Sequence, residues 1–274
     1  MLFRSGRTKV KELSVISQYT FPTFCKSKLM SCSAVDKLDS PEFKSILTPE
    51  LFTIAAPFEQ QGYDLRIVGG AVRDILLGIK PKDVDLSTNA TPSEMIELFK
   101  KNNIHYIETG LQHGTLTVHV NKRDFEVTTL RIDAETDGRH AKVQFTHDWK
   151  LDAERRDLTF NAMSAGLDGT LYDYFGGRED LSERRVKFVG DPRSRIQEDY
   201  LRILRYFRFY GRIALEEDNH DQATLNVIRE CAGGLRKIAV ERIWMEVSKI
   251  LTGNHTPSLV HRMYELNVSQ CIGE

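Results

Sequence analysis

The feature that most constrains the fold is a short apolar segment that ends in two glycines and continues as a helix. Leu65–Val68 has the composition of a strand, Gly69 and Gly70 form a turn, and Ala71–Leu77 has the pattern of a helix that Gly78 closes. Without a Cβ atom, a glycine lets the backbone approach a phosphate group, toward which the first amides of the helix point. We therefore expect an α/β fold with a phosphate-binding turn.

An ordinary tight turn is the alternative explanation for an isolated Gly-Gly pair. Two neighbours favour phosphate binding. Arg73, in the first turn of the expected helix, offers a forked, permanently charged donor group for phosphate oxygens. The sequence Asp83-Val84-Asp85 follows nine residues after Asp74, in the next expected strand.

That second strand, expected over Asp83–Leu86, presents two carboxylates. Residues two apart on a strand point to the same face, so Asp83 and Asp85 repel each other unless a cation lies between them. Mg²⁺ prefers carboxylates, water and substrate phosphates, and two such ions could activate a 3′-hydroxyl and stabilise a leaving pyrophosphate. Glu126, on the next hairpin, can supply a third carboxylate. A solvated strand edge is the alternative for the aspartate pair alone.

The remaining pattern gives the organisation of the chain. Ser40-Pro41 and Thr48-Pro49 predict two helix starts, and Thr91 predicts a third helix that runs to about Lys101. Further elements are a strand over 104–108, a hairpin of 115–120 and 125–130, a substrate-ordered loop over 133–140, and helical segments at 196–213, 221–231 and 239–252. We expect a nucleotide-binding α/β head, a mixed sheet with flanking helices, over residues 41–180, followed by an all-helical neck over 181–274.

Residues 1–35 contain six Lys or Arg and a single acid, Glu12. This composition resembles a mitochondrial transit peptide, and a disordered basic tail is the alternative. Initiation at Met30 would give a form without this segment, for the cytoplasm or nucleus. No apolar run approaches the ~20 residues of a membrane span, so we expect no membrane partner. The four cysteines form no close pair, which favours a reducing compartment.

The segment 196–213 is predicted to be a helix with a cationic face. Counted at 100° per residue from Asp199, its apolar side chains fall on one side, and Arg202, Arg205 and Arg208 fall on the other. Residues 184–212 contain nine basic and three acidic side chains, which predicts an anion site. Asp199 and Arg202 are three residues apart. They form either an ordinary helix ion pair or an acceptor and a donor that read the edge of a base.

These motifs resemble those of a known family. Gly69–Asp74 together with Asp83-Val84-Asp85 is similar to the first motif of class II tRNA nucleotidyltransferases, the CCA-adding enzymes of the polymerase β superfamily. Further motifs follow in family order: Arg155–Met163, Asp173–Gly177, Glu198–Arg205, and a last, structural motif at Glu241–Met245. The resemblance covers about residues 41–270 and is strongest to the animal mitochondrial members.

The resemblance implies roles for these residues. Asp83 and Asp85 would be catalytic and hold Mg²⁺, with Glu126 as the third catalytic carboxylate. Asp199 and Arg202 would act as a protein template that selects CTP and then ATP, with Arg205 and Arg208 near the nucleotide. Arg156 would bind phosphate or ribose, and Asp157 would hold the sugar or a neighbouring arginine, with Asn161 supporting that turn. The nucleotide-binding set is completed by Gly69, Gly70 and Arg73.

The implied function is addition of CMP and AMP, from CTP and ATP, to the 3′ end of tRNA. Family members continue into body and tail regions that hold tRNA, whereas this chain stops at Glu274, so we expect a C-terminally truncated member with weakened tRNA affinity. Two alternatives are a bacterial-type poly(A) polymerase and a catalytically weak tRNA-binding protein. The sequence leaves open whether two copies form a homodimer.

Overall fold

The computed structural model describes residues 37–136 and 141–272, and for residues 133–142 only the backbone where it is described. The predicted targeting segment 1–35 and positions 137–140 of the predicted loop lie outside these ranges.

Three helices begin where the sequence predicts them: α1 (Pro41–Ile46), α2 (Pro49–Gln60) and α4 (Pro92–Lys101). The hydroxyl groups of Ser40 and Thr48 accept hydrogen bonds from backbone amides in the first turns of α1 and α2. Thr91 and Glu94 cap each other's backbone amides at the start of α4, a reciprocal capping box. Since each cap satisfies amides that have no partner within the helix, the local sequence fixes these starting points.

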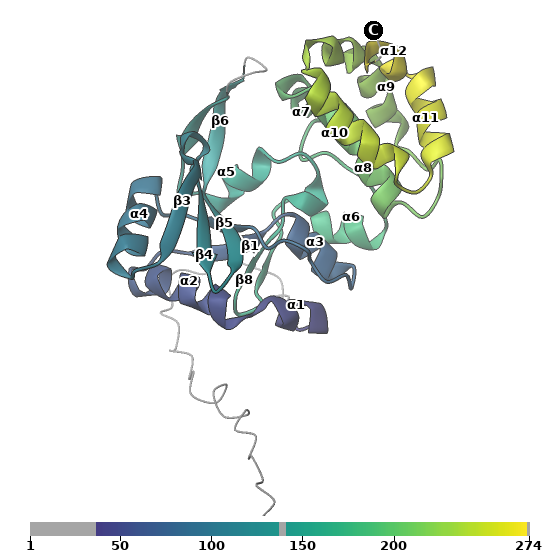
Figure 1. Cartoon of the computed structure of the whole chain (residues 1–274). Helices are drawn as coiled ribbons and strands as arrows, with labels where there is room; N and C mark the ends of the chain where they lie inside the picture. Colours follow the sequence, from purple (N-terminus) through teal and green to yellow (C-terminus); the bar gives the residue numbers. More distant parts are fainter. Residues whose placement is uncertain (1–36, 137–140, 273–274) are drawn as a thin grey trace, which may run out of the picture. The chain divides into compact units, whose positions relative to one another are not determined.

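Seven strands form one mixed sheet in the order β3-β4-β5-β2-β1-β8-β9 (Figure 1). Their bounds are β1 (Leu65–Val68), β2 (Leu86–Thr88), β3 (His105–Gly110), β4 (Thr115–Val120), β5 (Arg123–Thr129), β8 (Ser164–Gly166) and β9 (Leu171–Tyr172). Strands β2 and β5 are parallel, and the other neighbours are antiparallel. Leu86 lies opposite Val127 in the parallel pair. The chain just before β2 therefore lies beside Glu126.

The two faces of this sheet differ in chemistry. Helices α2 and α4 pack together and against strands β1, β3 and β4 (Figure 1), and Phe58 and Phe99 meet edge to face with their ring centroids 5.7 Å apart. These side chains are fully buried, and each contributes about 1.5–3 kcal/mol through burial of apolar surface. On the opposite face, the Arg66 guanidinium lies 3.9 Å from the Trp149 ring centroid, at the start of α5 (Trp149–Glu154). Arg66 thus adds a buried charged side chain to that face.

The remaining helices are α3 (Gly70–Leu76), α6 (Gly177–Ser182), α7 (Pro192–Glu198), α8 (Arg202–Ile213), α9 (Gln222–Cys231), α10 (Val240–Leu251), α11 (Thr256–Glu265) and α12 (Val268–Ile272). Short 3-10 helices are η2 (Leu111–His113), η3 (Thr159–Asn161) and η4 (Ala232–Lys237). From α6 to residue 272 the regular elements are helical, which confirms an α/β head followed by a helical region. The predicted boundary between residues 180 and 181 falls inside α6. No helix among the described residues has the length and apolar character to cross a membrane.

Three local predictions are wrong. The strand predicted over Asp83–Leu86 begins only at Leu86, because its partner β1 ends at Val68, whose N–H makes the last backbone bond, to the Asp85 carbonyl (3.0 Å). The loop predicted over 133–140 is strand over 133–136, since β6 (Arg131–Thr136) pairs with β7 (Ala141–Phe145). The helix predicted over 196–213 is interrupted: α7 ends at Glu198, Asp199 is extended (φ −151°), and α8 starts at Arg202.

Candidate nucleotide site

The glycine turn brings the backbone close to a cationic side chain. Gly69 has φ 63° and ψ −121°, a conformation that disfavours any residue with a Cβ atom. A Cβ atom built on Gly69 would lie 3.0 Å from Nη1 of Arg156. The amide of Gly69 donates to the Met163 carbonyl (3.1 Å), which ties the turn to the Arg155–Met163 motif. Glycine at this position therefore allows two motifs far apart in sequence to meet.

A chain of polar contacts continues from this turn. Arg73 is buried, and its Nη1 donates to Oδ1 of Asn161 (2.7 Å). Asn161 in turn donates to Oδ1 of Asp157 (3.2 Å), and Nε of Arg205 donates to Oδ2 of Asp157 (2.6 Å). Burial favours the neutral form of Asp157, but Arg205 and the bonds from Asn161 and the Leu158 amide outweigh it and lower the pKa of this carboxyl. The carboxylate therefore holds an arginine, one of the two alternatives predicted for it.

Asp152 of α5 is a second buried carboxylate that holds arginines, in this case the neighbouring Arg155 and Arg156. It is 3% exposed, and it accepts from Arg155 (Nη2, 2.8 Å) and from Arg156 (Nη2, 3.1 Å). Its pKa is lowered, because the attraction of these two cations outweighs the effect of burial. Arg156 also donates to the Asn161 carbonyl (3.3 Å). Asp152 thus fixes two cations at one edge of the site.

The three predicted carboxylates are close enough to influence one another. The pKa of Asp85 is raised by burial first and then by the negative charges of Glu126 and Asp83. Such mutual repulsion suits a cation. Within the described residues, no group of three or more His, Cys, Asp or Glu side chains is placed to hold a metal ion. Mg²⁺ is commonly held by one or two carboxylates together with water and substrate phosphates, and Asp83 and Asp85 fit that smaller donor set.

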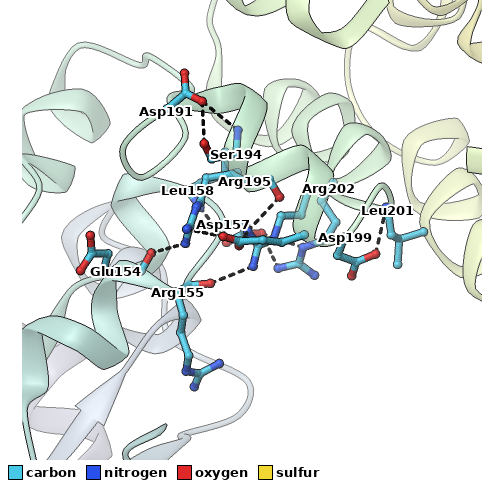
Figure 2. Close-up of polar contacts among 12 residues, drawn as sticks. Glu154, Arg155, Asp157, Leu158, Asp191, Ser194, Arg195, Asp199, Leu201 and Arg202 are labelled. Carbon is cyan, nitrogen blue, oxygen red and sulfur yellow. Dashed lines mark hydrogen bonds and ion pairs between the residues drawn. The ribbon is translucent and has the colours of Figure 1, made fainter. Parts of the chain in front are cut away.

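The turn between α7 and α8 places Asp199 and Arg202 differently from the helical prediction. Nη1 of Arg202 donates to the Arg195 carbonyl (2.9 Å) and to Oε2 of Glu198 (2.6 Å), and Nη2 donates to the Arg155 carbonyl (2.8 Å) (Figure 2). Arg202 is buried rather than part of an exposed stripe. Asp199 accepts from the Leu201 amide (3.1 Å), as Figure 2 shows. The i, i+3 helix ion pair considered for Asp199 and Arg202 is therefore wrong, because Asp199 lies outside the helix.

Side chains from α10 complete this region. Arg242 donates to Oδ2 of Asp199 (2.8 Å). Glu246, 5% exposed, accepts from Nη1 of Arg208 (2.9 Å). Burial lowers the pKa of Arg208, and the attraction of Glu246 opposes that effect. The carboxylates of α10 and α7 therefore pair with arginines that the sequence alone placed on an open cationic face.

These elements line one cavity of about 590 Å³. Ten of the predicted site residues line it: Gly69, Gly70, Arg73, Asp85, Arg156, Asp157, Asp199, Arg202, Arg205 and Arg208. Asp83 and Glu126 are not among the lining residues. Nine arginines and three aspartates line the cavity, which gives it a strongly positive character.

The structure adds lining residues that the sequence analysis missed: Arg131, Arg155, Leu201, Phe209, Arg212 and Arg242. Two of them carried a usable signal, since Arg155 adjoins Arg156 and Arg212 lies one helical turn after Arg208. Arg242 lies in the Glu241–Met245 motif, for which the sequence predicted only a structural role, because the tertiary fold alone brings α10 to Asp199.

This chain resembles known proteins and has the head domain of nucleotide-transferring polymerases. Residues 65–187 match the model of the poly A polymerase head domain, and residues 220–272 match that of a probable RNA and SrmB-binding site of polymerase A. The chain is 55% identical, over 86% of its length, to the mitochondrial CCA tRNA nucleotidyltransferase 1 of Homo sapiens and covers 55% of that protein. It therefore spans about half the length of the curated relatives it matches.

Solved structures give the same result. The Bacillus stearothermophilus CCA-adding enzyme in complex with CTP matches with a TM-score of 0.71 and 33% identity, over 84% of this chain and 53% of that one. A tRNA nucleotidyltransferase complexed with a primer tRNA and an incoming ATP analogue matches with a TM-score of 0.65 and 28% identity, over 81% and 62% of the two chains. The chain belongs to the family of CCA-adding tRNA nucleotidyltransferases that share the poly A polymerase head domain.

Proposed function

We propose that this protein adds CMP and AMP, from CTP and ATP, to the 3′ end of tRNA without a nucleic-acid template. The observation that carries the proposal is the single cavity in which Asp85, the glycine turn and the Asp199–Arg202 turn meet among nine arginines. A nucleoside triphosphate needs cations for its phosphates, carboxylates for its metal ion and a polar pair for its base. This cavity offers the cations, the polar pair and Asp85, and the charges of Asp83 and Glu126 act on Asp85 from nearby.

The names of the relatives support the same reaction. One is called a CCA tRNA nucleotidyltransferase, and two solved relatives hold CTP or a primer tRNA with an ATP analogue. We transfer CTP, ATP and the tRNA 3′ end to this chain on that basis. Since the relatives from Homo sapiens and Mus musculus are named as mitochondrial proteins, we also propose a mitochondrial location, for which residues 1–35 would be the signal.

The residues divide the work by charge. Arg156, Arg205 and Arg208 bind the triphosphate and neutralise charge on it. Asp83 and Asp85 would hold Mg²⁺, which when bound supplies activation of the 3′-hydroxyl and stabilisation of the leaving pyrophosphate, and Glu126 is the third carboxylate of the proposed site. The carboxylate of Asp85 must be deprotonated to hold the ion, so its raised pKa predicts that activity is lost as the pH falls.

Base selection falls to Asp199, an acceptor, and Arg202, a donor. In the structure both are engaged: Arg242 donates to Asp199, and the terminal nitrogens of Arg202 donate to Glu198 and to two backbone carbonyls. Reading a base therefore requires these side chains to exchange partners within the cavity. An exchange of hydrogen bonds costs little net free energy when each donor keeps an acceptor.

Primer extension tests the proposal. The protein is incubated with tRNA that lacks its CCA end, Mg²⁺ and labelled CTP or ATP, beside Asp85→Ala. Extension by the three nucleotides CCA, lost in Asp85→Ala, is expected. A long A tract would instead identify a bacterial-type poly(A) polymerase, and incorporation unchanged in the variant would refute the metal assignment.

A further inference from the structure

The base-reading turn rests on a second segment of the chain, of which only the end, Glu241 and Arg242, lies in one of the family motifs. This segment runs from Gly234, in η4, to Arg242, near the start of α10. It contacts the turn at three points. Gly234 lies against the ring of Tyr200, Nζ of Lys237 lies 5.8 Å from the centroid of the same ring, and Arg242 bonds to Asp199.

The contact at Gly234 is the tightest of the three. A Cβ atom added there would come closer than 3.0 Å to Cδ1, Cε1 and Cγ of Tyr200, a separation that real Cβ atoms essentially never show. The backbone at Gly234 does not require glycine, since its φ is not positive. The requirement is therefore steric: glycine is there because the aromatic ring occupies the space.

Both partners are held in place. On the Gly234 side, Ala232 and Leu235 are buried in the core, so η4 cannot withdraw easily. On the other side, Tyr200 is the second residue of a turn closed by two backbone bonds, from the Arg202 amide to the Asp199 carbonyl (3.0 Å) and from the Ile203 amide to the Tyr200 carbonyl (3.1 Å). A displaced Tyr200 ring therefore moves the backbone that carries Asp199 and Arg202.

We propose that Gly234 is a positioning residue for base selection: its missing side chain lets the Tyr200 ring seat against η4 and so sets where Asp199 and Arg202 face the nucleotide. This inference rests on the proposed function, because it assumes that these two residues read the base. Gly234 itself touches neither nucleotide nor metal in this account and acts only through Tyr200.

Gly233 provides a matched control. It is the preceding residue of the same 3-10 helix, its φ is also not positive, and a Cβ atom built there meets nothing within 4 Å. Gly233→Ala and Gly234→Ala thus make the same chemical change one residue apart, with and without the ring in the way.

The test measures the affinities of the whole chain for CTP and for GTP, in Mg²⁺, by calorimetric titration. Gly234→Ala is expected to reduce the preference for CTP over GTP by about tenfold or more, since misplacing positioned groups by 1 Å costs up to about 100-fold. Gly233→Ala should keep the wild-type preference. In the double variant Gly234→Ala, Tyr200→Leu the ring is gone, so the preference should largely recover.

Thermal unfolding of each variant shows that it is folded at the titration temperature. A wild-type preference retained in Gly234→Ala, or a double variant no better than Gly234→Ala, would overturn the inference alone. A wild-type protein that does not distinguish CTP from GTP would overturn the proposed function, and the inference with it.

Discussion

Replacing Asp157 with alanine removes the carboxylate that holds Arg205 in the wall of the cavity. The Asp157 side chain is 7% exposed and that of Arg205 is 32% exposed. Removing one partner of a fully buried pair destabilises a protein by about 3–5 kcal/mol, and because solvent reaches part of Arg205 we take the lower end, about 3 kcal/mol. That figure includes the bonds lost from the Leu158 amide (2.8 Å) and from Asn161.

For a protein of this size a loss of 1 kcal/mol lowers Tm by about 2–4 °C, so Asp157→Ala should unfold about 6–12 °C below the wild type. Circular dichroism during heating, and urea titration, measure the two quantities. Because the folded-state pKa of Asp157 is lowered, its contribution is present above the ordinary value of 3.8 and is lost as the pH falls through the folded value. The difference between wild type and variant should therefore shrink in acid.

Asp39→Ala is the control, because its ion pair with Lys44 is largely exposed (81% and 60%) and its loss should stay within experimental error. A destabilisation below about 1 kcal/mol for Asp157→Ala, or a difference that does not change in acid, would refute the reasoning.

Three further predictions follow from other contacts. Asp85→Asn should raise Tm in metal-free protein near pH 7, because it removes a negative charge that burial disfavours and that Glu126 and Asp83 repel, while incorporation of CTP is lost. A gain in Tm that persists below pH 3.8 would contradict this cause. Burial lowers the pKa of His220 to about 4, so the free energy of unfolding of the wild type should fall by about 2–3 kcal/mol more than that of His220→Phe between pH 7.5 and 4.5. Equal falls in urea titrations of the two proteins would contradict this role of His220. Thr91→Ala breaks the capping box of α4 and should cost about 1 kcal/mol in urea titrations without changing CTP affinity, and changed affinity would show that α4 reaches the site.

Local sequence signals were sufficient to predict the elements whose ends are determined by residues close in sequence. The capping residues Ser40, Thr48 and Thr91 predict helix starts because each cap involves atoms three residues away. The Gly69-Gly70 turn and its strand and helix are predicted for the same reason. These elements define the α/β head.

The features that the sequence could not predict depend on contacts between residues far apart in the sequence. Strand β2 starts at Leu86 because β1 ends, and the helix predicted over 196–213 breaks because Asp199 caps the next turn while Arg242 of α10 binds its carboxylate. Helical periodicity places Arg202 on an open face. In the structure its guanidinium instead donates to Glu198 and to the carbonyl of Arg155, which lies far away in the sequence. Ten residues that line the cavity were predictable from motifs, whereas most of their hydrogen-bond partners were not.

The central claim is that the arginine-lined cavity binds CTP and ATP in preference to other nucleotides through Asp199 and Arg202. Calorimetric titration of the four ribonucleoside triphosphates in Mg²⁺, with wild type and Asp199→Ala, tests it most directly. The account predicts tighter binding of CTP and ATP than of GTP and UTP, and loss of this preference in the variant with phosphate binding retained. Equal binding of all four by the wild type, or a preference unchanged in Asp199→Ala, would contradict it.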